Sequence, residues 1–288
     1  MEVVKIKRQA YKLLEDAIDT HIHVNPDLKE RLLGGFEAAE EAKEAGMKAI
    51  VIKSHYTMSI VQANIVSDAI TGIDVFGGIT LNQSVGGFNP AGVEVAIKYG
   101  AKIIWMPTVS AKCNLMNKGK DFSKGLSVFN EKKGEQSKLR PEVIEILDLI
   151  AKGNIILATS HISFEETLAL IKECNRIGVK KILINHPQNV YASMDIQRQK
   201  EIVEMGAYLE HCFNLCTPHL PIIHADDFAK SILTLGPDHC VMATDMGQLD
   251  NFKPTEGLRV FIQMMLDRGV KSDWIKKMVQ DNPVKLLY

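Results

Sequence analysis

The chain has 288 residues, 46% of them hydrophobic and 24% charged, which is the balance of an ordinary globular protein with a sizeable core. Its net charge of −1 at pH 7 gives no basic excess, so we expect neither nucleic acid nor a membrane surface as a partner. No apolar run reaches the roughly 20 residues that a membrane-spanning helix needs.

The first 19 residues, MEVVKIKRQAYKLLEDAID, predict an amphipathic N-terminal helix. They lack the continuous apolar segment of a secretory signal. The five cysteines of the chain are odd in number and widely spaced, which is typical of reduced thiols. Cys212 and Cys216 form a C-x3-C pair, but without a second pair we interpret them as incidental thiols. We therefore expect a cytoplasmic protein.

Short β-rich runs alternate with helical segments along the rest of the chain. The eight expected strands are 17–23, 48–55, 74–82, 101–108, 154–161, 180–186, 207–212 and 239–245. The expected helices are 34–46, 56–71, 89–99, 140–152, 163–177, 194–205, 224–235 and 255–269, with a further short helix from about residue 271. Within the helix expected from residue 163, Ser163 and Glu166 have the spacing of a capping box.

This alternation predicts an α/β fold of the (β/α)8 TIM-barrel class. Eight strand-helix units in roughly 250 residues match such a barrel, whose parallel sheet is covered by helices. We expect one domain over residues 1–288. A doubly wound open sheet is the alternative, but it often has a glycine-rich phosphate turn after its first strand, where this chain has HVNPDLKERLLGG.

The first strand ends in the motif DTHIH, with His21 and His23 one residue apart. Residues i and i+2 of a strand point to the same face, so the two imidazoles are placed to bind a metal together. The alternative is that the pair packs in the core or faces solvent.

Polar residues collect at the ends of the other expected strands, which is where catalysis takes place in such barrels. They are Lys53 and His55, Asn82 and Gln83, His161, His186, Glu210 and His211, and Asp245. Six of the nine histidines lie at strand ends. Neighbouring residues of a strand point to opposite faces, so only one of Glu210 and His211 can point inward, and we favour Glu210. Lys53 and His55 are two residues apart and should point to the same face.

Residues 110–140, after the fourth strand, form the longest segment without clear periodicity. This long loop has seven Lys and one Arg against one Asp and two Glu, a local charge of +5. We expect a mobile loop or lid that covers a substrate bearing carboxylate or phosphate, or a lysine-rich surface loop with no such role.

In their order along the chain, DTHIH, ATSHISFEE, INHPQN, ATDMGQ and QDNPVKLL resemble the motifs of the amidohydrolase superfamily of metal-dependent TIM-barrel hydrolases. The resemblance extends from His21 to Leu287. It implies a divalent metal bound by His21, His23, His161, His186 and Asp245. It also implies that Asp245 is the general base that takes a proton from a metal-activated water, with His186 as a second catalytic residue.

Binuclear members of the superfamily have a lysine or glutamate at the end of the fourth strand, where this chain has Thr108 and Ser110. The resemblance therefore implies one tightly bound ion. Zinc is our first expectation, and manganese, iron and nickel suit the same donors. Glu210 or Lys53 is the alternative ligand for a second ion. We otherwise expect Lys53, His55, Asn82 and Glu210 to bind substrate.

The expected function is metal-dependent hydrolysis of a small, possibly anionic substrate at an amide, lactone or phosphoester bond. The alternatives are a metal-dependent decarboxylase on the same scaffold, a phosphoesterase of the PHP type, which needs more carboxylates than we can place, and a non-catalytic metal or ligand binder. The sequence leaves open whether the chain forms a homo-oligomer.

Overall fold

The computed structural model describes residues 9–130 and 138–288. The chain divides into two compact units. Unit 1 comprises residues up to Ser54, Ser59–Gly77 and Leu209–Tyr288, and unit 2 comprises His55–Met58 and Gly78–Tyr208. Residues 9–12 are helical, as the sequence predicts, whereas the part of the expected N-terminal helix in residues 1–8 lies outside the described residues.

Unit 1 contains the first and the last strands of the chain. The parallel strands β1, β2 and β3 pair in that order, and β10 pairs in parallel with β11. They are β1 (Ile18–Ile22), β2 (Ala49–Ile52), β3 (Asp74–Phe76), β10 (Tyr208–Cys212) and β11 (Cys240–Ala243). The end of β1 also forms a parallel bridge with the residue after Asp245, Met246. The first strand therefore lies beside the last, as a closed barrel requires.

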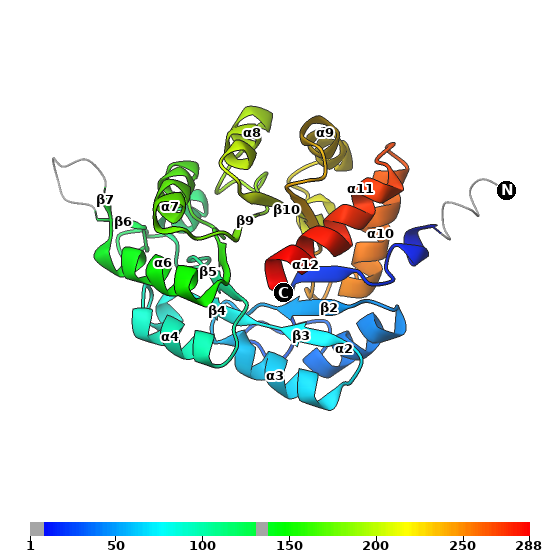
Figure 1. Cartoon of the computed structure of the whole chain (residues 1–288), viewed down its shortest axis with the longest axis horizontal. Helices are drawn as coiled ribbons and strands as arrows, with labels where there is room; N and C mark the ends of the chain where they lie inside the picture. Colours follow the sequence, from blue (N-terminus) through cyan, green and yellow to red (C-terminus); the bar gives the residue numbers. More distant parts are fainter. Residues whose placement is uncertain (1–8, 131–137) are drawn as a thin grey trace. The chain divides into compact units, whose positions relative to one another are not determined.

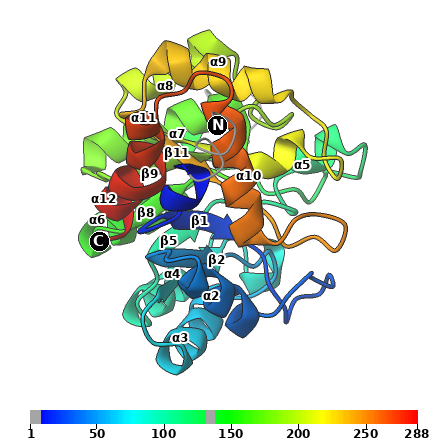
Figure 2. The ribbon, with the colours of Figure 1, turned by 90° about the vertical axis from the view of Figure 1, so that its right-hand side faces the viewer.

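Helices cover the strands of unit 1. They are α2 (Gly35–Glu44), α3 (Ser59–Ala69), α9 (Ala225–Leu235), α10 (Pro254–Leu266), α11 (Ser272–Lys276), the π-helical turn η3 (Lys277–Asp281) and α12 (Asn282–Leu287), with a 3-10 turn η2 (Phe213–Cys216) after β10. Figure 1 shows α2 and α3 along one side of β2 and β3. Figure 2 shows α10 beside β1 and α2. The core between these elements includes the stacked rings of Phe213 and Phe261, with Phe228 packed against Phe261.

Unit 2 contains four parallel strands in the order β4, β5, β8 and β9. They are β4 (Gly78–Thr80), β5 (Ile103–Trp105), β8 (Ile156–Ala158) and β9 (Ile182–Asn185). The helices of this unit are α4 (Pro90–Lys98), α5 (Lys112–Asn117), α6 (Pro141–Gly153), α7 (Phe164–Ile177) and α8 (Ile196–Glu204), with a 3-10 turn η1 (Gln83–Val85). The strands are fully buried, and α4, α6 and α7 pack side by side.

The strand that the sequence predicts over residues 74–82 is two strands, β3 and β4, separated at Gly77. A Cβ at Gly77 would lie 2.8 Å from the backbone carbon of Ser59, and one at Gly78 would lie 1.8 Å from the carbonyl oxygen of Ile103. Both positions therefore require glycine because backbone atoms approach them closely. The other seven predicted strands are present but shorter than expected, as for β8, which covers three residues of the expected 154–161. The helices predicted from residue 34 onward are present with small differences at their ends, whereas the described part of the N-terminal helix ends at residue 12.

The segment 110–140 contains more regular structure than the sequence indicates. The helix α5 begins at Lys112, and a two-stranded antiparallel hairpin pairs β6 (Phe129–Asn130) with β7 (Lys138–Leu139). Residues 131–137 lie outside the described residues. The predicted capping box is present at the start of α7, and the Glu166 carboxylate also accepts from the Ser127 hydroxyl at 2.7 Å. This hydrogen bond joins the segment, at Ser127, to the first turn of α7.

Among the described residues, no helix is both long and apolar enough to cross a membrane.

Candidate metal centre

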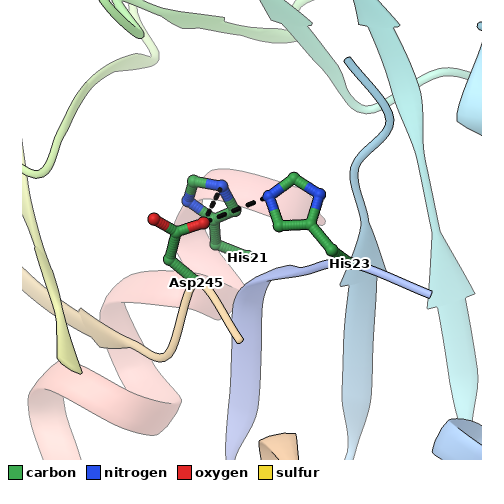
Figure 3. A group of neighbouring side chains, drawn as sticks. All are labelled: His21, His23 and Asp245. Carbon is green, nitrogen blue, oxygen red and sulfur yellow. Dashed lines mark hydrogen bonds and ion pairs between the residues drawn. The ribbon is translucent and has the colours of Figure 1, made fainter. Parts of the chain in front are cut away.

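Three predicted ligands converge in unit 1. His21 lies in β1, His23 follows it, and Asp245 follows β11. Asp245 Oδ1 lies 3.1 Å from His21 Nε2 and 3.1 Å from His23 Nε2. Figure 3 shows this oxygen between the two imidazoles. The Asp245 side chain keeps 15% of its surface exposed, whereas both histidines are buried.

The other nitrogen of each ring faces a hydrogen-bond acceptor. His23 Nδ1 donates to the carbonyl oxygen of Lys53 at 2.8 Å. His21 Nδ1 donates to Glu210 Oε2 at 3.0 Å. A carbonyl oxygen cannot donate, so the proton of neutral His23 is on Nδ1 and its Nε2 presents a lone pair to Asp245. Burial lowers the pKa of His23 to about 4, although Asp245 acts against this shift, so the ring is neutral at pH 7.

Two imidazole lone pairs and a carboxylate oxygen repel one another unless positive charge lies between them. Nitrogen and oxygen atoms bound about 2.1 Å from a tetrahedral ion are roughly 3.4 Å apart, which is close to the separation of 3.1 Å observed here. Partner groups on Nδ1 are also what metal-binding histidines usually have. The residues of this centre therefore fit a divalent cation.

Glu210 on β10 positions His21. Its Oε1 accepts from the Thr20 hydroxyl at 2.5 Å while Oε2 holds the His21 ring. Cys212 lies in the same cluster, with Sγ 3.5 Å from Glu210 Oε2 and 3.8 Å from His21 Nδ1. Donor atoms of His21, Glu210 and Cys212 thus form a second group that is compact enough to hold an ion. Cys212 therefore contacts this cluster, whereas its role, and that of Cys216, stays a prediction.

A buried carboxylate links the two strands that carry the ligands. Asp19 accepts from the backbone N–H of His21 at 3.2 Å, and from the backbone N–H and hydroxyl of Thr244 at 3.1 and 2.6 Å. Burial raises the pKa of Asp19 to about 7 although these hydrogen bonds act to lower it. Asp19 therefore fixes the end of β1, with His21, against the end of β11, with Asp245.

Two basic side chains are buried in the polar interior of unit 1. Lys53 is buried, and burial lowers its pKa while Asp245 and Glu210 act to raise it. Arg31, in the loop after β1, is also buried and forms an ion pair with Asp27 at 2.6 Å. The charge of Arg31 helps to lower the pKa of His23. The sequence interpretation missed this pair, which its opposite charges at i and i+4 directly after the HIH motif could have indicated.

The backbone is strained at several of the predicted ligand positions. His186 and Asp245 have positive φ values of 34° and 55°, as does Ser160, directly before His161, at 55°. Non-glycine residues rarely adopt such angles, and they concentrate at functional sites.

The remaining predicted ligands lie together in unit 2. The His161 and His186 rings have centroids 5.0 Å apart, and His161 stacks on Tyr191 at 4.3 Å. His161 Nδ1 lies 3.4 Å from Asn114 Oδ1. Asn114 Nδ2 donates to the carbonyl oxygen of Val109, so Oδ1 is the acceptor for His161. Nε2 of His161 then carries the lone pair, as in His21 and His23.

The structure thus brings His21, His23 and Asp245 together in unit 1 and His161 with His186 in unit 2. That all five form one ligand set stays a prediction.

The predicted substrate-binding residues make specific contacts within the protein. Glu210 faces His21, whereas His211 packs on the Phe228 ring on the other face of β10, which is the alternation expected. Asn82 is buried and binds backbone groups. The strand β2 ends at Ile52, before Lys53 and His55. Strand alternation therefore does not determine which way these two side chains point. The substrate contacts of these residues stay predictions.

Comparisons with known proteins agree with this fold. The model of a protein family described as "Family of unknown function (DUF6282)" matches residues 16–210. In a comparison with curated proteins, none matched the chain significantly. Among solved structures, an amidohydrolase from Pseudomonas aeruginosa is similar over 98% of both chains, with a TM-score of 0.66 and 14% identity.

Two other solved structures are similar over almost the whole chain. A phosphotriesterase homology protein from Escherichia coli, solved with phosphate in its active site, has a TM-score of 0.60 and 13% identity, covering 95% of this chain and 100% of its own. A 2,6-dihydroxybenzoate decarboxylase from Rhizobium has a TM-score of 0.55 and 10% identity, covering 95% of this chain and 98% of its own. The predicted resemblance to the amidohydrolase superfamily is confirmed at the level of the fold, which is α/β and of the TIM-barrel class.

Proposed function

The chain belongs to the family of unknown function DUF6282, and we propose that it is a hydrolase that uses one bound divalent cation to cleave a small, anionic substrate. The bond is an amide, a lactone or a phosphoester. We propose zinc as the ion because imidazole and carboxylate donors suit it, and manganese, iron or nickel as substitutes with the same donors. We also propose a cytoplasmic location.

The observation that carries this proposal is the convergence of His21 Nε2, His23 Nε2 and Asp245 Oδ1. Both rings have their Nδ1 proton engaged, by Glu210 and by the Lys53 carbonyl, so both Nε2 atoms can act as ligands. The scaffold supports the proposal independently, since the similar solved structures include an amidohydrolase and a phosphotriesterase homology protein.

The protein side chains have distinct roles in this proposal. A bound divalent cation polarises the scissile bond and brings the pKa of water from 15.7 toward about 7. Asp245 keeps 15% of its side-chain surface exposed, so its carboxylate can contact a water molecule, and we assign it the role of general base. Glu210 and the Lys53 carbonyl keep His21 and His23 oriented. The catalytic role of His186 and the metal-binding roles of His161 and His186 remain part of the proposal.

The test combines metal analysis with a panel of lactones, phosphoesters and amides. We expect about one equivalent of metal in the wild-type protein and turnover of at least one class. Asp245→Asn should lower kcat by about 10² to 10⁴, the usual contribution of a general base. Asp250→Asn is the matched control, because Asp250 follows in the same loop but is exposed and paired with His219. Metal-loaded protein that hydrolyses none of the panel, or unchanged turnover in Asp245→Asn, would refute the proposal.

A metal-dependent decarboxylase is the second candidate, because a decarboxylase is among the structures of similar fold. Aromatic carboxylic acids in the same panel separate the two reactions. Release of carbon dioxide without hydrolysis of any ester, lactone or amide would favour decarboxylation. Bound metal with no turnover of any kind would favour a non-catalytic binder.

A further inference from the structure

Hydrogen bonds within unit 2 fix the orientation of the Asn82 amide. Its Oδ1 accepts from the backbone N–H groups of Thr108 at 2.9 Å and Ser110 at 3.0 Å. Its Nδ2 donates to the carbonyl oxygen of His55 at 2.8 Å and to the Thr108 hydroxyl at 2.6 Å. Exchanging oxygen and nitrogen would set donors against donors at two backbone N–H groups. Thr108 Oγ1 therefore accepts a hydrogen bond from the Asn82 amide.

The Thr108 hydroxyl in turn donates a hydrogen bond to His55. Thr108 is fully buried, and its Oγ1 lies 2.9 Å from His55 Nδ1. Among the residues that the structure describes, the hydrogen-bond contacts of Oγ1 are these two, with Asn82 and with His55. If Nδ1 donated to Thr108 instead, the buried hydroxyl proton would have no acceptor, at a cost of about 1 to 3 kcal/mol. That cost favours a proton on Nε2 of neutral His55 by roughly 5- to 160-fold.

His55 thus differs from its neighbour His161. Their ring centroids are 6.2 Å apart, and His161 also stacks on Tyr191. The acceptor oxygen of Asn114 places the His161 proton on Nδ1, whereas Thr108 leaves the His55 proton on Nε2. Neighbouring histidines therefore present opposite groups: a lone pair from His161 suits a cation, and an N–H from His55 suits an anion.

We propose that His55 donates a hydrogen bond from Nε2 to an oxyanion of the substrate, a carboxylate or phosphate oxygen, and that Thr108 and Asn82 are positioning residues that hold it in this tautomer. The anionic substrate rests on the proposed function; the tautomer does not. A neutral N–H of fixed orientation stabilises negative charge on oxygen without first having to gain a proton. His55 is only partly buried, as is its neighbour His161, so both rings keep part of their surface exposed.

Nitrogen-15 NMR of the histidine side chains in the full-length protein tests the tautomer directly. The signal of His55, assigned by its loss in His55→Gln, should show protonated Nε2 and bare Nδ1. Thr108→Val removes the donor to Nδ1, so its His55 signal should move toward the other tautomer, while Thr108→Ser keeps the wild-type pattern. Protonated Nδ1 in the wild-type protein would overturn the inference without the need for any variant.

Titration with inorganic phosphate tests the ligand. We expect phosphate to shift the His55 signal and to bind about fivefold or more weakly to Thr108→Val and His55→Gln, as for the loss of one hydrogen bond to a charged group. Thr108→Ser should bind within about twofold of wild type. Equal affinities in all four proteins, or no binding to the wild type, would overturn the role of His55. Metal content is measured in the same samples, so failure of the proposed metal site is seen separately.

Discussion

His211 is a buried histidine whose neutrality affects the stability of the protein in acid. It packs against the Phe228 ring, 5.7 Å between centroids, on the face of β10 opposite Glu210. Burial lowers its pKa from 6.5 to about 4, although the charge of Glu210 acts to raise it. Between these two pH values the unfolded chain binds a proton that the folded protein does not, so stability is lost as the pH falls from 6.5 toward 4.

We predict that His211→Leu reduces this acid sensitivity. The wild-type protein should lose on the order of 3 kcal/mol through His211 over that range, at about 1.4 kcal/mol per pKa unit. Urea unfolding with a chelator at several pH values measures the difference between the proteins. His219→Gln, which removes an exposed histidine, should keep the wild-type slope. The same slope in His211→Leu and wild type would contradict the assignment.

Among the residues of the candidate metal centre, the ligands were easier to predict from sequence than the groups that orient them. His21, His23 and Asp245 could be selected because strand ends and alternation limit where their side chains point. Alternation also indicated that Glu210 points inward, but not that it orients His21, because the two residues are 189 positions apart and meet only after folding. The Lys53 carbonyl has no sequence signal at all, since every residue has one.

At the scale of elements, strand and helix positions were predictable, but the break between β3 and β4 was not. The side-chain pattern of residues 74–82 continues across Gly77 and Gly78, and a glycine in a strand does not reveal which backbone approaches it. Gly78 pairs with Ile103 on β5, with the carbonyl oxygen of Ile103 in the space a Cβ would take.

We predict that Gly78→Ala destabilises the protein by about 3 kcal/mol, because a clash with backbone cannot be relieved by rotating a side chain. Gly153→Ala is the control in the same unit. Its added Cβ would meet its nearest neighbour, an Ile97 side-chain atom, at 3.5 Å, and alanine in the last turn of α6 should be neutral or stabilising by up to about 1 kcal/mol. Urea midpoints of the three proteins check the order; a Gly78→Ala protein as stable as wild type would show that β4 can move away from β5.

At the scale of the molecule, a link between the first and last strands joins the residues of the candidate metal centre. Asp19 and Thr244 are 225 residues apart, and their hydrogen bonds fix the strand ends that carry His21 and Asp245. The match to the family model ends at residue 210, before Thr244 and Asp245. Asp19 lies in the DTHIH motif and Thr244 in the ATDMGQ motif, but neither motif indicates that these two residues contact each other, so this link is found only in the folded structure.

We predict that Thr244→Val weakens both the fold and the metal centre. Valine keeps the shape of threonine but removes the hydroxyl that donates to Asp19 Oδ2 at 2.6 Å, which leaves a buried carboxylate oxygen short of one donor. The expected loss is about 1 to 3 kcal/mol in the free energy of unfolding, with weaker metal binding because the two ligand-bearing strand ends are less firmly joined. Thr244→Ser restores the donor and should recover most of both losses. Urea unfolding in chelator measures the first effect and competitive metal titration the second. If Thr244→Val binds metal as tightly as wild type despite its lower stability, the ligands do not depend on this link for their positions.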